Sequence, residues 1–440
     1  MNSGSSTEQK TLARWIKEDT KAFSLDSQDN FNSAVDTMIT SFDKSLALLG
    51  FGEALHGGEE ILKLRNRLFQ RLVEKYGFSA IAIESSFPRA HLTNEYILGR
   101  GPKTYKELLD KGFGQGVGQL ESNRELVEWM KEYNADSNHK TKLQFYGIDI
   151  PTGTNGIASP RQVIMFVLDY LSVSDGHDIK ERRERIDKLI GDDAKWGNPF
   201  AIMNPNQSIA LSSEASALRI ETEDLIAELQ SCRPELVQKT NQDAFTEALQ
   251  YGVVARGLLN FHAAMANKTT YPKALGIRDA LQADNLLYMV SREKDRGKVF
   301  VFAHNGHLKK GTSEWLQGSE KAVWWAAGSQ LKERLGKSYA VIGTSVGVSE
   351  ENGINKPEAG TLEERLIARP IRLIPTYQGK KFSQSELISL PFRTGSQKNF
   401  TYFPLNAQSF TDFDWLAVLN EVSYPRGGTP LQTWDTSSKE

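Results

Sequence analysis

The stretch LALLGFGEALHGGEE, residues 46–60, decides the fold of this 440-residue chain. Its first half is a short apolar run bounded by glycine, which is typical of a buried strand. Leucine and isoleucine then recur at helical spacing from Ile61 to Leu72, and the paired glycines before them permit a tight turn. Glu53 and His56 therefore lie at a strand end, where open α/β sheets place their chemistry. The alternative for this stretch alone is a helix cap beside a surface histidine.

Two later stretches also end a predicted strand with an acidic residue. Residues 79–84 are nearly all apolar, as expected of a parallel strand covered on both faces, and they end in Glu84. Residues 142–149 form the next predicted strand and end in Asp149. Because strand, helix, strand units have one handedness, consecutive parallel strands end at the same edge of the sheet. We therefore expect Glu84 beside the first motif, although a carboxylate at a strand end can also cap a helix.

Histidines cluster directly after the fourth predicted strand. Residues 298–303, KVFVFA, are followed at once by His304 and His307, two of the seven histidines in the chain. A fifth strand is predicted from Tyr339 to Gly343. The repetition of one pattern, an apolar run that ends in Glu or His, favours one polar site at a single sheet edge.

Helical periodicity replaces the strand pattern between residues 160 and 266. We expect an α/β fold around a mostly parallel sheet, with residues 1–155 and 270–430 forming the catalytic core. Residues 156–269 would be an inserted helical bundle that roofs the cleft, since ligand sites favour domain junctions. Residues 431–440 are a polar tail.

The composition narrows the possible functions. Lys and Arg number 53 and Asp and Glu 55, the net charge is −2, and the basic residues are scattered, so nothing indicates nucleic acid or a membrane surface as partner. The single Cys232 excludes an internal disulfide framework and a Cys-based zinc cluster. No apolar stretch is long enough to span a bilayer, and the first nine residues do not resemble a signal peptide. We expect a soluble, cytoplasmic protein.

Two glycine-containing motifs partly resemble a nucleotide-binding loop and a serine-hydrolase elbow, but neither has the surrounding pattern that its function requires. Residues 112–118, GFGQGVG, have neither GxGxxG nor P-loop spacing and follow a helix, so we interpret them as a mobile loop beside the site. Residues 343–347, GTSVG, match the serine-hydrolase elbow. However, a region rich in Gly, Asn and Pro follows in place of a helix, and no histidine comes after Ser345. We therefore expect no serine nucleophile.

Histidines and carboxylates without a nucleophile suit hydrolysis by activated water. Neutral histidine accepts a proton near neutral pH, and an adjacent carboxylate holds its tautomer and stabilises the imidazolium. The residue types also leave an alternative open, in which the cluster binds zinc, iron or haem, with or without hydrolysis. The possible ligands by type are His56, Glu84, His304 and His307. Their spacing matches no established zinc signature.

Several motifs together resemble those of the erythromycin esterase family. They extend, with gaps, from about Leu46 to Gly347. They are Gly52-Glu53-Ala-Leu-His56-Gly with Glu60 and Arg65, Ile83-Glu84-Ser-Ser, Phe145-Tyr-Gly-Ile-Asp149, Arg278-Asp279, Ala303-His304-Asn-Gly-His307 and Gly328-Ser-Gln-Leu-Lys-Glu-Arg-Leu-Gly336. The resemblance implies a three-layer α/β/α core with an inserted helical part. It also implies cofactor-free, metal-independent hydrolysis of a small-molecule ester, which is the macrolactone bond in the resistance enzymes.

The resemblance further implies roles for the matching residues. The catalytic residues are His56, Glu53, Glu84, His304 and His307, and the substrate-binding residues are Arg65, Glu60, Asp149 and Arg278. His56 resembles the general base, with Glu53 or Glu84 orienting its imidazole. Arg65 or a protonated His304 or His307 would stabilise the oxyanion. The sequence departs from the family at Leu55, where a small polar residue is common, and it aligns poorly after Pro357.

Overall fold

A computed structural model describes residues 21–152, 156–173, 179–198, 204–267, 271–317, 320–367, 371–376, 389–396 and 398–429. The polar tail predicted at 431–440 lies outside these residues. The amphipathic pattern of residues 11–23, with Leu12, Trp15 and Ile16 on one side, predicts a helix, which lies mostly outside them as well. Its described end, Lys21–Phe23, is strand β1 rather than helix, because it pairs with a later strand of the sheet.

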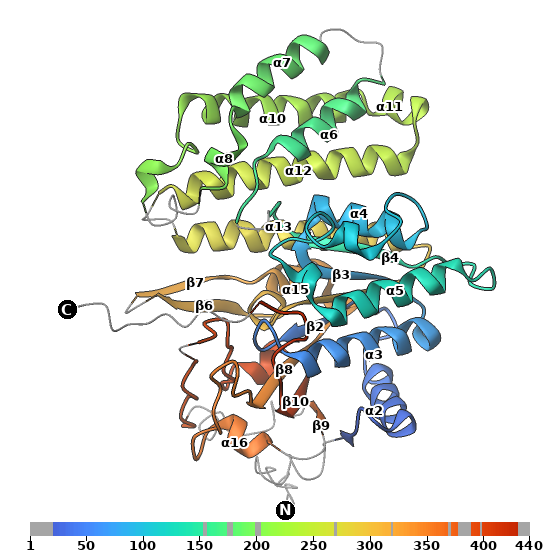
Figure 1. Ribbon diagram of the computed structural model, residues 1–440, viewed down its shortest axis with the longest axis vertical. Coiled ribbons are helices and arrows are strands. Elements are labelled where there is room, and N and C mark those ends of the chain that lie inside the picture. The colour runs from blue at the N-terminus through green and yellow to red at the C-terminus, as the bar shows by residue number, and fades with distance from the viewer. Residues whose placement is uncertain are drawn as a thin grey trace, which may run out of the picture.

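Strands and helices alternate over most of the chain (Figure 1). The strands are β1, β2 (Leu48–Glu53), β3 (Phe78–Ser86), β4 (Gln144–Asp149), β5 (Lys298–His304), β6 (Thr312–Gln317), β7 (Glu320–Trp325), β8 (Tyr339–Val348), β9 (Ile371–Pro375) and β10 (Trp415–Glu421). The helices before residue 160 are α2 (Gln28–Thr40), α3 (Glu59–Tyr76), α4 (Phe87–Ile97) and α5 (Glu121–Ala135). Those that follow are α6 (Arg161–Leu171), α7 (Ile179–Ile190), α8 (Asp193–Trp196), α10 (Ser213–Ser231), α11 (Arg233–Lys239), α12 (Gln242–Met265), α13 (Tyr271–Glu293), α14 (Asn305–Leu308), α15 (Ala327–Leu335), α16 (Leu362–Leu366) and α18 (Ser409–Asp412).

Eight of the described strands form one sheet in the order β1-β9-β10-β8-β2-β5-β3-β4. The strands from β10 to β4 pair in parallel, and the antiparallel β9 and β1 complete one edge. The prediction of a largely parallel sheet is therefore confirmed. Glu53 at the end of β2 pairs in register with His304 at the end of β5, and β3 lies on the other side of β5. The strand ends that carry the motif residues thus meet at one edge.

Alternate residues of the central strands face two different hydrophobic cores. Ile81 and Phe300 are fully buried on the side of α2, α3 and α5. Ala80 and Val299 are fully buried on the other side, with α13 and α15. Helices therefore cover both faces of the sheet, which explains why these strands are apolar at almost every position. This burial leaves the strand ends as the place for polar side chains.

Helix α3 starts and stops where the sequence predicted. Gly58 is its N-cap, and Glu59 and Glu60 place negative charge in the first turn, where the helix dipole favours it. Gly77 ends the helix with φ 71° in the left-handed region, which glycine adopts without steric cost. The short turn between β2 and α3 therefore fixes how His56 leaves the sheet.

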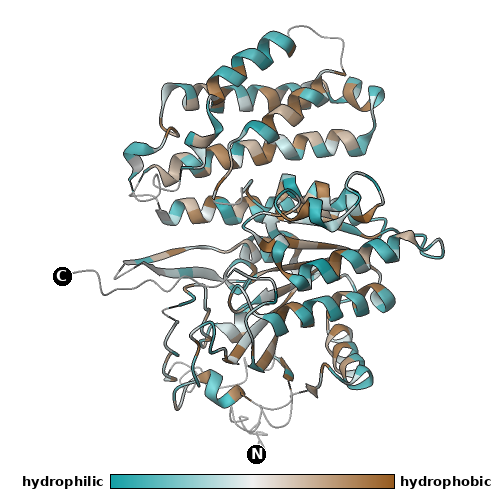
Figure 2. Ribbon diagram, viewed as in Figure 1, coloured by the Kyte–Doolittle hydropathy of each residue, from teal (hydrophilic) through white to brown (hydrophobic). Residues whose placement is uncertain are grey.

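The described residues between 161 and 265 form helices and no strand. Helices α6 to α12 lie beyond α13, as Figure 1 shows, with α12 packed on α13 and α13 packed on β4. The outermost helix, α7, is mostly hydrophilic in Figure 2, and its buried residues are Ile186 and Ile190. We predicted that this part roofs a cleft. The packing places α13 between these helices and the sheet. That helices α6 to α12 cover a substrate cleft therefore stays a prediction.

Three local elements differ from the sequence-based prediction. Strand β8 continues to Val348, so Ser345 lies inside a buried strand, in agreement with the rejection of a nucleophile elbow. The segment before residues 112–118, Thr104–Lys111, which the sequence pattern predicts to be a helix, contains only a short 3₁₀ helix, Tyr105–Leu108. The β6–β7 hairpin and β9 were not predicted, because their apolar runs are short and interrupted by charge. None of the described helices is both long and apolar enough to cross a membrane.

Candidate functional site

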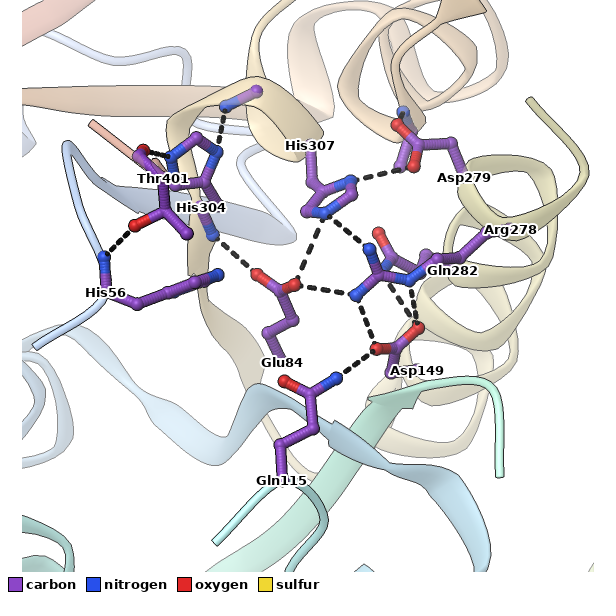
Figure 3. A network of polar contacts seen from close by, with 12 residues as sticks. His56, Glu84, Gln115, Asp149, Arg278, Asp279, Gln282, His304, His307 and Thr401 are labelled. Atoms are coloured by element: carbon purple, nitrogen blue, oxygen red, sulfur yellow. Dashed lines mark hydrogen bonds and ion pairs between the residues drawn. The ribbon is translucent and has the colours of Figure 1, made fainter. Parts of the chain in front are cut away.

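Four motif side chains converge at the ends of β2, β3 and β5 (Figure 3). His56 follows β2, Glu84 lies near the end of β3, His304 ends β5, and His307 lies in α14 directly afterwards. Figure 3 shows Glu84 with His56 and His304 on one side and His307 and Arg278 on the other. The carboxyl ends of neighbouring parallel strands share one edge, and this topology produces the convergence.

His56 combines access to solvent with a carboxylate partner. The exposed fraction of its side chain is 42%, against 8% for Glu53. Its Nδ1 lies 2.5 Å from Oε1 of Glu53, and among the described residues none hydrogen-bonds its Nε2. Burial lowers the pKa of His56, but the charge of Glu53 and the hydrogen bond to it outweigh burial and raise that pKa above its ordinary value. An imidazole held by a carboxylate in this way can accept a proton through its other nitrogen.

Glu84 connects the two halves of the cluster. Its Oε2 accepts from the backbone N–H of His304 at 2.8 Å, and its Oε1 accepts from Nη2 of Arg278 at 2.8 Å. The same Oε1 lies 3.2 Å from Nε2 of His307. Burial raises the pKa of Glu84, but the charge of His307 and its hydrogen bond, with help from His56 and Arg278, hold that pKa well below its usual range. Glu84 is therefore an anion near neutral pH.

Two carboxylates hold His307 as a cation. Its Nδ1 lies 2.7 Å from Oδ1 of the fully buried Asp279, and its Nε2 lies 3.2 Å from both Oε1 of Glu84 and Nη1 of Arg278, whose charge opposes that of the two carboxylates. Burial lowers the pKa of His307, but Asp279 and Glu84 outweigh it and raise the pKa to about 10. The second oxygen of Asp279 accepts from the backbone N–H of Ala327 at the start of α15. His307 therefore carries charge near neutral pH and does not serve as a base there.

Arg278 on α13 completes this charged side. It binds Asp149 through two parallel bonds, Nε to Oδ1 at 2.8 Å and Nη2 to Oδ2 at 2.6 Å. Asp149 is fully buried and also accepts from Gln282 at 3.1 Å. Burial lowers the pKa of Arg278, but Asp149 and then Glu84 raise it above its usual value. Arg278 thus balances two buried carboxylates, as buried ion pairs require.

His304 is neutral, and both of its ring nitrogens are engaged. Nδ1 accepts from the N–H of Gly306 at 3.1 Å, and Nε2 lies 2.7 Å from the carbonyl oxygen of Thr401. Since a carbonyl only accepts, Nε2 carries the proton. Burial and then the nearby His56 lower the pKa of His304 to about 3. His304 thus differs from His307 in charge, although both belong to one four-residue motif.

Close packing explains the glycine before Glu53. A Cβ on Gly52 would lie 2.3 Å from Oδ1 of Asn305, closer than side chains approach. Asn305 in turn accepts from the N–H of Thr344 at 3.1 Å and donates to the carbonyl of Thr344 at 2.9 Å. These bonds tie α14 to β8. The glycine in the Gly-Glu pair of the first motif is therefore a packing requirement.

Two predicted substrate residues are not brought into the cluster. Arg65 lies on the buried side of α3 with an exposed fraction of 1%, and its guanidinium stands 4.9 Å from the ring centroid of Phe302. Burial lowers the pKa of Arg65 to about 10. Glu60 accepts from the backbone N–H and the hydroxyl of Ser423, which follows β10. Among the described residues, neither hydrogen-bonds a histidine of the cluster.

Four residues that contact the cluster were not assigned to the site from the sequence. They are Gln115, Asp279, Gln282 and Thr401. Asp279 could have been found, because it follows Arg278 in one of the family motifs. Gln115 has a φ of 56°, the one positive value outside glycine among the described residues, and the flanking glycines were a signal. No local pattern marks Thr401.

The predicted metal ligands do not form a set of free ligands. Both ring nitrogens of His304 are hydrogen-bonded and His307 is a cation, whereas a metal needs neutral histidine with a free nitrogen. One ligand atom each of Glu53, His56 and Glu84 lie within 4.8 Å of one another. In that set, Nδ1 of the imidazole is bound to Glu53 and Nε2 has no hydrogen-bond partner among the described residues, an arrangement that metal-binding histidines also have. The geometry fits proton transfer between an imidazole and a carboxylate.

Two hollows occur in the described part of the helical region, and neither contains a residue of the cluster. One, of about 510 Å³, is lined by Lys195 and Gln207 among others. The other, of about 450 Å³, is lined by Arg219, Ile220 and Arg256 among others. The predicted cleft between the core and the helical part therefore stays a prediction.

Comparison with known proteins assigns the family. The family model described as erythromycin esterase matches residues 73–420, a range that begins after His56. The Escherichia coli erythromycin esterase type II is 25% identical over 345 residues, covering 75% of each chain.

Solved structures share the fold. A Bacillus cereus protein superposes with a TM-score of 0.72 at 19% identity, over 95% of this chain and 98% of that one. A histidine-to-asparagine mutant of the erythromycin esterase EreC, in its open conformation, superposes with a TM-score of 0.66 at 18% identity, over 92% of this chain and 98% of the other. The family model matches most of the sequence, and the largely parallel sheet is consistent with that match. The chain therefore belongs to the erythromycin esterase family.

Proposed function

We propose that this protein hydrolyses a carboxylic ester, with a macrolactone as the favoured substrate class, by water that His56 activates. The observation that carries the proposal is the half-exposed imidazole of His56, whose Nδ1 is held at 2.5 Å by the buried carboxylate of Glu53. Family membership supports an esterase. The alternative, a metal- or haem-binding protein, is not favoured by that membership.

In this mechanism His56 and Glu53 act as a unit. Nε2 of His56 takes a proton from water as the water oxygen attacks the ester carbonyl. Glu53 stabilises the imidazolium that forms and keeps the proton of Nδ1 in place. The tetrahedral intermediate then breaks its bond to the alcohol oxygen, and His56 returns the proton to that leaving group. Glu84, within 4.8 Å of the same pair, is placed to orient the water.

The oxyanion needs nearby positive charge, and of the three predicted residues His307 suits that role best through its charge, since its two ring nitrogens already face Asp279 and Glu84. It is a cation, with its pKa raised to about 10 by Asp279 and Glu84 against burial. His304 supplies no such charge, because burial and the nearby His56 lower its pKa to about 3. Arg65 is 1% exposed and stands behind the sheet on α3. Preorganised groups that face the charge developing in the transition state usually make the largest electrostatic contribution to catalysis.

Substrate choice belongs, in this proposal, to residues 156–269 as an inserted helical subdomain. Its packing on α13, the helix that carries Arg278 and Asp279, supports a route from the helical part to the cluster. Catalytic groups would then come from the sheet and specificity from the helices.

The test is incubation with a panel of 14- and 16-membered macrolides, read by mass for the gain of one water. We expect turnover of at least one lactone, and His56→Asn should reduce it about 10²- to 10⁴-fold, because a general base is lost. Since the side chain of His56 is 42% exposed, the variant should unfold at nearly the same temperature.

Two controls accompany this assay. His91→Asn changes an exposed histidine of α4 and should leave turnover unchanged. Dialysis against a chelator should also leave it unchanged. Wild-type turnover by His56→Asn would remove His56 as the base, and loss of turnover on chelation, restored by metal, would establish the metal alternative.

A further inference from the structure

The turn that carries His56 is held by residues from the far end of the chain. Residues 398–405, which we call the C-terminal strap, cross the strand ends after the described part of β9. The N–H of His56 donates to Oγ1 of Thr401 at 2.9 Å, and its carbonyl accepts from Nδ2 of Asn399 at 2.8 Å. The carbonyl of Ala54 accepts from the N–H of Phe403 at 2.7 Å. The strap thus hydrogen-bonds both the N–H and the carbonyl groups of the turn.

The same strap also holds His304. The carbonyl of Thr401 lies 2.7 Å from Nε2 of His304, and Figure 3 shows Thr401 between the two histidines. The ring centroids of His56 and His304 are 5.2 Å apart. One residue therefore touches both imidazole-bearing segments, through its hydroxyl on one and its carbonyl on the other.

The strap is itself fixed to the core. The hydroxyl of Thr401 donates to Oδ1 of Asn399 at 2.6 Å, and Asn399, 4% exposed, is bound to Asn352 at 2.9 Å. Farther along, the N–H of Leu405 donates to the buried carboxyl of Glu363 at 2.7 Å. A segment tied at several points can hold its neighbours in one geometry.

We propose that Thr401 is a positioning residue: its hydroxyl sets the backbone of His56, and its carbonyl fixes His304 as the neutral Nε2–H tautomer. His304 then transfers no proton. Because its backbone N–H donates to Oε2 of Glu84 at 2.8 Å, the strap also helps to position Glu84 through His304. The catalytic part of this inference rests on the proposed hydrolysis, whereas the tautomer of His304 does not depend on it.

The hydroxyl is the part of this arrangement that substitution can remove. Thr401→Val keeps the shape but leaves the N–H of His56 without its partner, while Oδ1 of Asn399 still accepts from the backbone N–H of residue 401. We expect kcat for the hydrolysed macrolide to fall about 10- to 100-fold with little change in KM, since small misplacements of a catalytic group cost that much. Thr401→Ser, which keeps the hydroxyl, should retain most of the turnover. Thr222→Val removes a buried hydroxyl bonded to Leu218 in α10 and should change nothing.

Nitrogen-15 NMR of the histidine rings provides a readout independent of catalysis. Seven histidines make assignment by substitution practicable. In the wild type, His304 should appear as the Nε2–H tautomer and stay neutral through the pH range near 7. In Thr401→Val, the titration midpoint of His56 should fall, because its turn loosens and Nδ1 moves away from Glu53. Thr401→Ser and Thr222→Val should titrate like the wild type.

Each outcome decides something. The inference fails if His304 is the Nδ1–H tautomer, or if Thr401→Val keeps both the wild-type kcat and the wild-type titration of His56. If the wild type hydrolyses none of the panel, the proposed function fails, and the NMR results alone decide whether Thr401 positions His56. If Thr401→Val does not fold, the wild-type tautomer and the smaller variant Thr401→Ala decide instead.

Discussion

The two sides of helix α14 contain the same residue type in opposite electrical states. On the side of α13, His307 lies between Asp279 and Glu84, and these carboxylates raise its pKa to about 10 against burial. On the side of the C-terminal strap, His304 faces a carbonyl and an N–H, and burial followed by the charge of His56 lowers its pKa to about 3. The motif His-Asn-Gly-His therefore contains one neutral ring and one cation.

This contrast shows that the partners rather than the residue type determine the chemistry. The α13 side is a buried network of charges that balance one another, and it offers fixed positive charge. On the strap side, neutral hydrogen bonds hold the backbone of His56, and its side chain, which is 42% exposed, has the single carboxylate Glu53 as partner. A proton can be exchanged on the strap side, while the α13 side keeps its charge constant. The following substitutions test this division.

The largest effect should come from removing the cation on the α13 side. Arg278→Met leaves the buried carboxylates of Asp149 and Glu84 without their shared partner. We expect it to lower the free energy of unfolding by about 3–5 kcal/mol, as for other broken buried ion pairs. Urea unfolding followed by circular dichroism measures this.

The matched control for Arg278 is an exposed ion pair. Arg334 bonds Asp284, and the exposed fractions of their side chains are 46% and 40%. Arg334→Met should change the free energy of unfolding by less than about 1 kcal/mol. A similarly small change in Arg278→Met would show that the network on the α13 side is not a balanced set of charges.

His307 should make stability depend on alkaline pH. Its pKa is raised from the ordinary value of about 6.5, so its stabilising contribution is fully present below about pH 6.5 and is lost as pH rises through about 10. The free energy of unfolding should fall in that window by up to about 1.4 kcal/mol per pH unit.

Two histidine variants check this slope. His307→Gln cannot carry the charge, so its unfolding free energy should change less between neutral and alkaline pH than that of the wild type. His91→Gln, at an exposed position of α4, should keep the wild-type slope. Equal slopes in His307→Gln and the wild type would mean that His307 is not charged in the folded protein.

The α13 side could be predicted from the sequence better than the strap side could. Apolar runs ending in Glu84 and Asp149 are local patterns, and parallel strands bring their ends to one edge, so the convergence follows from topology. Thr401 is different. Its partner His56 is 345 positions away, and residues 398–405 have no periodic pattern to place them. Hydrogen bonds between irregular segments leave no such local mark.

Helix α3 shows a second limit of prediction from sequence. Arg65 and Glu60 were assigned to the substrate because they stand in a family motif. Arg65 falls on the apolar stripe of the helix with Leu64 and Leu68, and this spacing could have indicated that it faces the core. Glu60 is directed to Ser423, whose position after β10 no local pattern predicts.

The smallest expected effect concerns the partner of His56 on the strap side. Glu53→Gln removes the negative charge but keeps an oxygen that accepts from Nδ1. Because Glu53 is the cause that raises the pKa of His56 against burial, the variant should have a lower pKa there. A base acts when deprotonated, so kcat/KM of the proposed hydrolysis rises with pH through that pKa. In Glu53→Gln this acidic limb should move to lower pH by up to about one unit, since an adjacent opposite charge shifts a pKa by about that much or more.

The measurement is kcat/KM against pH. Glu60→Gln, which alters the contact with Ser423, is the control and should keep the acidic limb of the wild-type pH profile. A limb that stays in place in Glu53→Gln would mean that another group limits the reaction at acidic pH, and the division between a proton-exchanging side and a fixed-charge side would no longer hold.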